Sequence, residues 1–384
     1  MKNNKPKIRF KDFTGPWEQR KLGELVDVCN GRDYKHLKEG TIPVYGTGGY
    51  MLSVNEALSY DKDAIGIGRK GTIDKPYILY APFWTVDTLF YAIPAEKFDL
   101  HFAFDIFQNI DWKMKDESTG VPSLSKTAIN NIDIFIPKYY EQQFIGRLFS
   151  NLDHLITLHQ RKCDNLKKIK KAMLEKLFPK NGNSIPEVRF KGFTDDWEQR
   201  KLRDIVGIYD GVHQTPKYQD GGIMFLSVEN IATLHSSKYI SEEDFKRDYK
   251  VYPQENDILM TRIGDVGTTN VVTDNGLKAY YVSLALLKYR STNPFFLSNA
   301  IQSDYVQNGL SNRTLKTAIP MKINKDEIGK VDVMLPTSTD EQVQIGTYFR
   351  NLDNLITLHQ RKVENLKKIK KAMLEKMFPK EDLI

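Results

Sequence analysis

Two sets of loop residues in this 384-residue chain carry side chains that could do chemistry, and that chemistry is hydrogen bonding to nucleic acid. One set begins near Gly31 and the other near Gly211. Arg reads guanine through two hydrogen bonds and Gln or Asn reads adenine, while Lys, Thr and Tyr hold phosphates. The candidate DNA-binding residues are Arg32, Tyr34, Lys35, His36, Arg69, Lys70 and Lys126 in the first set, and His213, Gln214, Thr215, Lys217, Tyr218, Arg262, Arg313, Lys316 and Thr317 in the second.

Motifs for catalysis or cofactor binding are weak in this sequence. Gly66-x-Gly68-x-x-Gly71 fits the dinucleotide fingerprint in form only, because no βαβ unit or downstream acidic residue accompanies it. The matched segment of the second half has Arg262 in place of Gly66. The two cysteines lack metal-ligand spacing, and the seven histidines form no cluster. We therefore predict no catalytic residue, no metal and no cofactor bound by this chain.

The elements that must position these loops are repeated within the chain. Residues 8–26 return at 188–206, and residues 141–180 return at 341–380. Of the last 30 positions of the second repeat, 26 are identical. Residues 27–140 and 207–340, which lie between the repeats, share only short patches. This order predicts two different reading domains, each held between copies of the same two repeats, which we call its mount.

The second repeat predicts a long helix in each half. Its apolar residues alternate steps of four and three, which is the spacing of a coiled coil. Pro179 and Pro379 close the two segments. Because each helix follows its own domain, we expect the two to pack antiparallel, with an internal pseudo-two-fold. The predicted helix seam comprises Ile145, Phe149, Leu152, Ile156 and Leu166 in the first copy and Ile345, Phe349, Leu352, Ile356 and Leu366 in the second.

Both variable segments read as mixed strand and helix with Gly turns. Each ends in an alternating strand closed by Pro, at residues 132–137 and 331–336. Upstream of that strand, residues 125–128 match residues 315–318, so we expect Lys126 and Lys316 to be equivalent. The predicted fold class is thus α+β, with two mixed α/β domains joined by two long antiparallel helices.

The charge is concentrated in the two helices. The chain has a formal net charge of +7, and residues 161–180 and 361–380 each hold eight Lys or Arg against two acidic residues. Such basic stripes suit a phosphate backbone. No apolar stretch is long enough to span a membrane, and residues 1–11 lack a signal peptide pattern. We therefore expect a cytoplasmic protein with no membrane partner.

Five segments of the chain match one known family: the repeated RFKxFTxxWEQRKL segment, the helix that begins with Glu-Gln, the NLDxLITLHQRK block, Thr215-Pro-Lys-Tyr218 and Ile263-Gly-Asp-Val-Gly267. They resemble the specificity subunit of type I restriction-modification enzymes. The resemblance covers essentially the whole chain. It implies target recognition domains at 1–140 and 181–340, each reading one half of a split, asymmetric site in double-stranded DNA. It also implies spacer helices at 141–180 and 341–384.

The same resemblance implies the partners of the chain. Two modification (methyltransferase) subunits would use S-adenosylmethionine to methylate adenine, and restriction/translocase subunits would use ATP and Mg. Two alternatives stay open on the residues alone. One is a coiled-coil protein-interaction scaffold without DNA specificity, and the other is a stand-alone nuclease or methyltransferase, against which the missing motifs argue.

Overall fold

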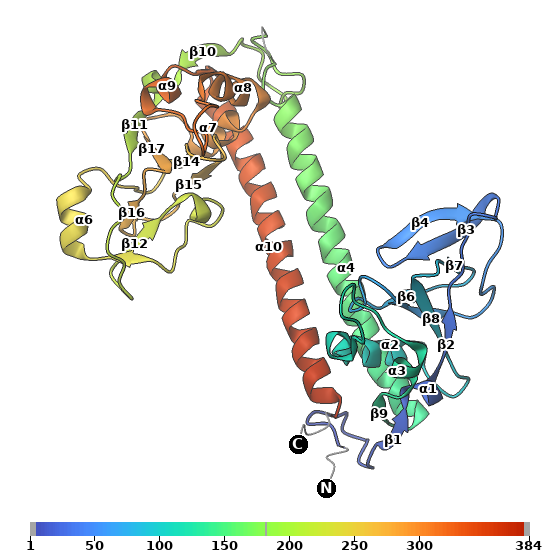
Figure 1. The fold of residues 1–384 in the computed structure, drawn as a ribbon. Helices are drawn as coiled ribbons and strands as arrows, with labels where there is room; N and C mark the ends of the chain where they lie inside the picture. The colour runs from blue at the N-terminus through green and yellow to red at the C-terminus, as the bar shows by residue number, and fades with distance from the viewer. Residues whose placement is uncertain (1–4, 181–182, 380–384) are drawn as a thin grey trace. The chain divides into compact units, whose positions relative to one another are not determined.

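The computed structural model describes residues 5–180 and 183–379, which form two compact units. Unit 1 comprises Met1–Gln160 and Gln360–Ile384, and unit 2 comprises Arg161–His359. Each unit therefore holds one domain, half of its own long helix and half of the other (Figure 1). The predicted domain borders at 1, 181 and 384 lie outside the described residues.

The first domain is a mixed α/β domain that ends in a long helix, α4 (Tyr139–Lys176). Its strands are β1 (Glu18–Lys21), β2 (Val26–Asn30), β3 (Glu39–Gly46), β4 (Gly49–Val54), β5 (Ala64–Gly68), β6 (Tyr77–Leu79), β7 (Trp84–Thr85), β8 (Leu89–Pro94) and β9 (Asp133–Ile136). Its shorter helices are α1 (Leu22–Leu25), α2 (Leu100–Asn109), η1 (Trp112–Lys115) and α3 (Lys126–Asn130).

The second domain repeats this order and ends in α10 (Thr339–Met377). Its strands are β10 (Glu198–Lys201), β11 (Gly207–Asp210), β12 (Ile223–Leu226), β13 (Tyr239–Ile240), β14 (Ile258–Thr261), β15 (Thr269–Val271), β16 (Lys278–Tyr280), β17 (Leu284–Lys288) and β18 (Asp332–Leu335). Its helices are α5 (Leu202–Ile205), η2 (Val228–Asn230), α6 (Glu242–Asp248), α7 (Pro294–Ile301), α8 (Asp304–Arg313) and α9 (Lys325–Gly329). The predicted fold class, mixed α/β domains with two long helices, is confirmed.

The sheets of the two domains match strand for strand. The four-stranded sheets have the orders β2-β8-β5-β6 and β11-β17-β14-β15, and the three-stranded sheets have the orders β4-β3-β7 and β13-β12-β16. The final strand of each domain pairs with its entry strand, as β1 with β9 and β10 with β18. Gly68 faces Leu89 and Thr261 faces Leu284 in the central pairs, so the register identifies Gly68 with Thr261.

The ends of the long helices close the core of each unit. In unit 1, the Phe378 ring lies 5.8 Å from Trp17 and 6.1 Å from Phe149. In unit 2, the Phe178 ring lies 6.0 Å from Trp197 and 5.9 Å from Phe349. Aromatic pairs at such distances add about 0.5–1.5 kcal/mol each beyond burial.

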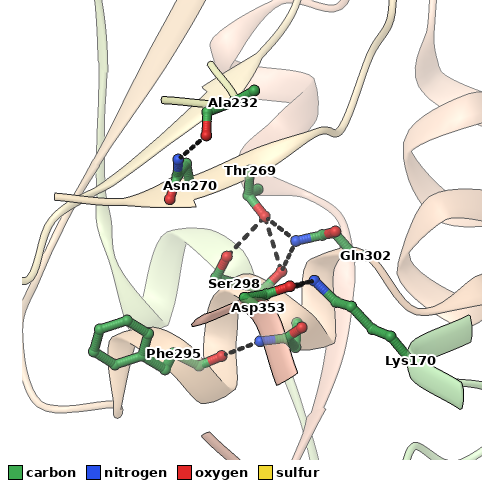
Figure 2. A network of polar contacts seen from close by, with 9 residues as sticks. Lys170, Ala232, Thr269, Asn270, Phe295, Ser298, Gln302 and Asp353 are labelled. Atoms are coloured by element: carbon green, nitrogen blue, oxygen red, sulfur yellow. Dashed lines mark hydrogen bonds and ion pairs between the residues drawn. The ribbon is translucent and has the colours of Figure 1, made fainter. Parts of the chain in front are cut away.

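Within each unit the two helices pack antiparallel, as predicted. Asp153 of α4 accepts a hydrogen bond from Lys370 of α10 at 2.5 Å in unit 1. Lys170 donates to Asp353 at 2.7 Å in unit 2 (Figure 2). The seam residues Ile145, Phe149, Ile345, Phe349, Leu352 and Ile356 are buried, and Leu152, Ile156, Leu166 and Leu366 are half-buried.

The short helices α2 and α7 dock on the start of the long helices through identical contacts. Gln142 accepts a hydrogen bond from the backbone N–H of Asp99 at 3.2 Å, and Gln342 accepts one from Asn293, also at 3.2 Å. A side chain at Gly146 or Gly346 would clash with these N-caps, so glycine is required at both positions. The two mounts are therefore the same in structure as well as in sequence.

A buried polar network joins the sheet of unit 2 to α7 (Figure 2). The Thr269 hydroxyl donates to the carbonyl of Ser298 at 2.9 Å, and Gln302 donates to the Thr269 hydroxyl at 2.9 Å. Asn270, next in the strand, donates to the carbonyls of Ile231 and Ala232. These bonds hold the loop after β12 against the sheet that carries α7.

In unit 1, α2 carries a buried carboxyl, Asp105, that is not fully hydrogen-bonded. Its side chain is 1% exposed, and its Oδ2 has no hydrogen-bond partner among the described residues. Burial raises the pKa of this carboxyl well above its usual value, against the opposing charge of Lys370. The equivalent residue of α7 is Asn299, whose amide donates to the carbonyl of Phe295 at 2.7 Å.

We expect Asp105→Asn to raise the free energy of unfolding by about 1–3 kcal/mol at neutral pH, because it removes a buried, unsatisfied acid. The raised pKa means that the folded chain keeps this proton where the unfolded chain has lost it. The contribution of Asp105 to the stability of the wild type therefore falls as pH rises above about 3.9, and the advantage of the variant should grow in urea titrations over that range.

The equivalent position of unit 2 supplies the matched control for this substitution. Asn299→Asp places the same acid in unit 2, where it would break the bond to Phe295. It should lower the free energy of unfolding, and more strongly as pH rises. Equal stabilities of wild type and Asp105→Asn at neutral pH would contradict the assignment.

Candidate nucleic-acid interface

Four segments of unit 1 meet at the turn between β7 and β8. The backbone N–H of Arg32 donates to the carbonyl of Thr85 at 2.8 Å, and that of Arg69 donates to the carbonyl of Thr88 at 2.8 Å. The N–H of Val86 donates to the carbonyl of Tyr45, at the tip of the β3–β4 hairpin. We call residues 31–36, 45–50, 69–71 and 85–88 the first loop cluster.

The first loop cluster presents most of the candidate residues of its domain. Arg32, Lys35, His36, Arg69 and Lys70 are exposed. Tyr34 is half-buried and packs on the small core of the three-stranded sheet. An open cleft of about 780 Å³ lies between this loop and the hairpin, lined in part by Lys35 and Tyr50.

Unit 2 builds the same arrangement with other side chains. The N–H of Val212 donates to the carbonyl of Tyr280 at 3.3 Å, that of Arg262 to Ser283 at 2.9 Å, and that of Tyr281 to Leu226 at 2.8 Å. We call residues 211–218, 226–228, 262–264 and 280–283 the second loop cluster. Its exposed candidates are His213, Gln214, Thr215, Lys217 and Tyr218, and a cleft of about 800 Å³ separates them from α6.

The glycines before each loop explain why the chain can pass so close to the turn. A Cβ at Gly31 would collide with the carbonyls of Val86 and Leu89, and one at Gly211 would collide with those of Tyr280 and Tyr281. Only glycine avoids this contact. The glycine at the head of each loop, a feature of the sequence, therefore serves the backbone and leaves the following side chains free to differ.

Arg262 differs from the other candidates because it is 5% exposed. Its guanidinium forms an ion pair with Asp210 and donates to the carbonyl of Ile323 at 3.0 Å. In this structure it joins three segments of unit 2 and is largely shielded from solvent. Arg313 is half-buried and forms an ion pair with Glu327 at 3.3 Å.

The structure corrects the expected equivalence of Lys126 and Lys316. The N–H of Leu124 donates to the carbonyl of Arg69, and the N–H of Ile323 donates to that of Arg262. Each donor is followed by a short helix, which starts at Lys126 in α3 and at Lys325 in α9. Lys126 therefore matches Lys325, and the shared letters at 315–318 arise by chance. The same bonds match Arg262 with Arg69, not with Gly66.

The remaining candidates lie near the loop clusters. Lys126 stands 3.8 Å from Asp27 and is exposed. Lys316 and Thr317 are exposed in the segment after α8, which returns beside the second loop cluster where the N–H of Gly264 donates to Met321. Sequence reasoning missed Lys322 and Lys325, which are also exposed there, because the residues next to them differ from those of the first domain.

The described residues hold neither a metal site nor a membrane span. Within residues 5–180 and 183–379, no three His, Cys, Asp or Glu residues are grouped so that they could hold a metal ion. In the same residues, no helix is long and apolar enough to cross a membrane.

The chain matches a family described as "Type I restriction modification DNA specificity domain", at residues 14–168 and again at 194–368. Two curated relatives come from Methanocaldococcus jannaschii. The type I restriction enzyme MjaVIII specificity subunit is 24% identical over 277 residues, covering 68% of this chain and 65% of the relative. The putative type I restriction enzyme MjaX specificity subunit is 21% identical over 301 residues, covering 70% and 63%. The matches thus span just under two thirds of the relatives' own lengths.

Solved structures with a similar fold include the S subunit of a type I restriction-modification system from M. genitalium. It has a TM-score of 0.76 and 14% identity, over 98% of this chain and 99% of that chain. A chain from a structure of "complex assembly and conformational transition of the type I R-M system" has a TM-score of 0.51 and 17% identity, over 95% and 98%. At these identities the likeness concerns the fold.

Proposed function

Because this chain belongs to the type I restriction modification DNA specificity family, we propose that it selects the DNA sequence on which a type I restriction-modification enzyme acts. Each loop cluster reads one half of a split, asymmetric site in double-stranded DNA. The observation that supports this most is that both clusters stand on the same hydrogen-bonded backbone while their side chains differ. Arg32 and Val212, for example, donate from equivalent backbone positions.

In this proposal the chain is not an enzyme and the chemistry belongs to its partners. Two modification subunits bring S-adenosylmethionine and methylate adenine, and restriction/translocase subunits bring ATP and Mg. The chain itself binds none of these cofactors. Because its target is the DNA of the cell, we also propose that it acts in the cytoplasm.

The long helices offer a surface on which the modification subunits would dock. Leu155 and Leu158 of α4 are 40% and 38% exposed, and Leu355 and Leu358 of α10 are 43% and 47% exposed. The two pairs lie in the repeated block and outside the buried seam. Exposed apolar residues that recur at equivalent places favour two copies of one partner.

The test is selection from a library of randomised duplexes by the full chain, purified with its modification subunits, at physiological salt. We expect two separate blocks of enriched sequence. Changing Gln214 and Lys217 together to Ala should weaken only one block, because both residues lie in the second loop cluster. Lys246→Ala on α6 is the control, since that side chain is 76% exposed and paired with Glu242 at 3.3 Å.

The runner-up is a coiled-coil scaffold that binds proteins without reading DNA. It predicts binding that depends on salt but enriches no sequence. A library without any enriched block would therefore favour the scaffold and reject the proposed function.

A further inference from the structure

Arg69 and Arg262 have the same backbone environment but opposite surroundings for their side chains. The N–H of each arginine donates to the turn before the neighbouring strand of its sheet, β8 or β17. The carbonyl of each accepts from the segment that precedes a short helix, at 3.0 Å in both units. Two residues further on, Gly71 and Gly264 have nearly the same positive φ, 86° and 83°. The difference between the two arginines must therefore come from the residues around their side chains.

In unit 2 the neighbours of Arg262 make a place for a buried guanidinium. Asp210 pairs in register with Ala285, whose side chain is a single methyl group. The Arg262 guanidinium is buried with Asp210 as its counter-ion and the carbonyl of Ile323 as a second acceptor. A charge this deeply buried is stable only when it is paired.

In unit 1 both of these neighbours are changed. Asn30 stands at the position of Asp210, and Phe90 stands at the position of Ala285. Phe90 is 2% exposed and presents a bulky ring where unit 2 has a methyl group. The Arg69 guanidinium lies outside, 5.8 Å from the centre of that ring, and none of the described carboxylates forms an ion pair with it. Its fork of donors is therefore open to a ligand.

We propose that the residue at position 30 or 210 decides whether this arginine reads DNA. Resting on the proposed function, the proposal assigns Arg69 to a guanine in the half-site of unit 1, through the bidentate pairing of guanidinium with O6 and N7. It assigns Arg262 to no base, because its guanidinium is buried and already paired with Asp210. Asn30 and Asp210 are then specificity-determining residues that need not touch DNA.

The ring of Phe90 strengthens this assignment. A guanidinium lying over an aromatic face is oriented but not neutralised, because the ring brings a quadrupole and no counter-ion. Asp210 instead supplies a full negative charge that DNA would have to displace. The guanidinium of Arg69 is thus available to bind DNA, while that of Arg262 is held in an ion pair.

Four variants of unit 1 in the library selection test the proposal. Arg69→Ala should lose the preference for guanine at one position of the first block, by roughly 5- to 100-fold, the discrimination of one bidentate pair. Arg69→Lys keeps the charge but not the fork, and should reduce the same preference while keeping most of the salt dependence. Asn30→Asp should hold Arg69 in an ion pair, as Asp210 holds Arg262, and should weaken the preference for guanine likewise. Asn30→Ser, which removes the amide without adding charge, should not.

The outcomes separate the inference from the proposed function. If the wild type enriches no sequence, the proposed function itself fails. If it enriches two blocks and Arg69→Ala leaves both unchanged, only the inference fails. Arg69→Lys with full guanine preference would show that the guanidinium fork is not what reads the base, and equal effects of Asn30→Asp and Asn30→Ser would show that the charge at position 30 does not control Arg69.

Unit 2 supplies the complementary result. Arg262→Met should lower the thermal midpoint, because Asp210 is left unpaired, and should leave the base preferences of the second block unchanged. A folded Arg262→Met variant that loses a guanine from the second block would overturn the assignment. If that variant does not fold, the unit 1 series still decides the question.

Discussion

A chain in which residues 27–131 are replaced by a second copy of residues 207–330 is expected to recognise the second half-site twice and the first not at all. The junctions are equivalent, because the N–H of Leu22 donates to Ile132 and the N–H of Leu202 donates to Val331. The transplanted α7 would meet Gln142 and Gly146 in place of Gln342 and Gly346, with the same docking contact. The mount should accept either domain.

Library selection with this chimera should enrich two copies of one block. Each base of the lost block would no longer be discriminated, which corresponds to about 1–3 kcal/mol per base pair. The reciprocal chimera, with residues 27–131 in place of 207–330, should enrich the other block twice. A folded chimera that still selects the original pair of blocks would show that the segments are not independent readers.

Changing Leu155 and Leu158 to Asp should abolish docking of one modification subunit and leave the chain itself stable. Both side chains are exposed in the free chain, so the free energy of unfolding should change by only about 0.5 kcal/mol per site. In a complex the two carboxylates would be buried without partners, which costs several kcal/mol. Binding should weaken by about 100-fold or more, at 1.4 kcal/mol per tenfold.

Sedimentation of the chain with purified modification subunits measures this loss. Changing Leu355 and Leu358 to Asp should remove the other copy, and all four changes together should leave the chain without either. Thr157→Asp is the matched control, because it adds a carboxylate between the two leucines on another face of α4, at an exposed position. Unaltered stoichiometry in the fourfold variant would place the docking surface elsewhere.

The long helices and the doubled domain order could be predicted because the segments that form them occur twice in the sequence. The apolar residues at steps of four and three mark one stripe of a helix, and the burial of Phe149 and Phe349 follows from that spacing. The helices begin two residues earlier than expected, at Tyr139 and Thr339, and the first ends at Lys176, before Pro179. The repeat set the element, while local backbone geometry set its ends.

The matching of the two variable domains could not be predicted residue by residue. A few shared letters match Lys126 with Lys316, but the backbone hydrogen bonds match it with Lys325, whose immediate neighbours differ from those of Lys126. The equivalence is carried by backbone hydrogen bonds, which do not depend on side-chain identity. The fate of Arg262 was hidden for a related reason, because Asp210 and Ala285 lie far from it in sequence and meet only across β17.

The order of synthesis gives the closing role of Phe378 a further consequence. Unit 2 is one continuous stretch, Arg161–His359, whereas unit 1 is completed only by the half-helix that begins at Gln360. On the ribosome, the first domain to emerge is therefore the last to be finished. At about 5–20 residues per second, its core waits roughly 10–40 s for Phe378. During that interval Trp17, Phe102 and Phe149 lack the ring that packs on them in the folded unit.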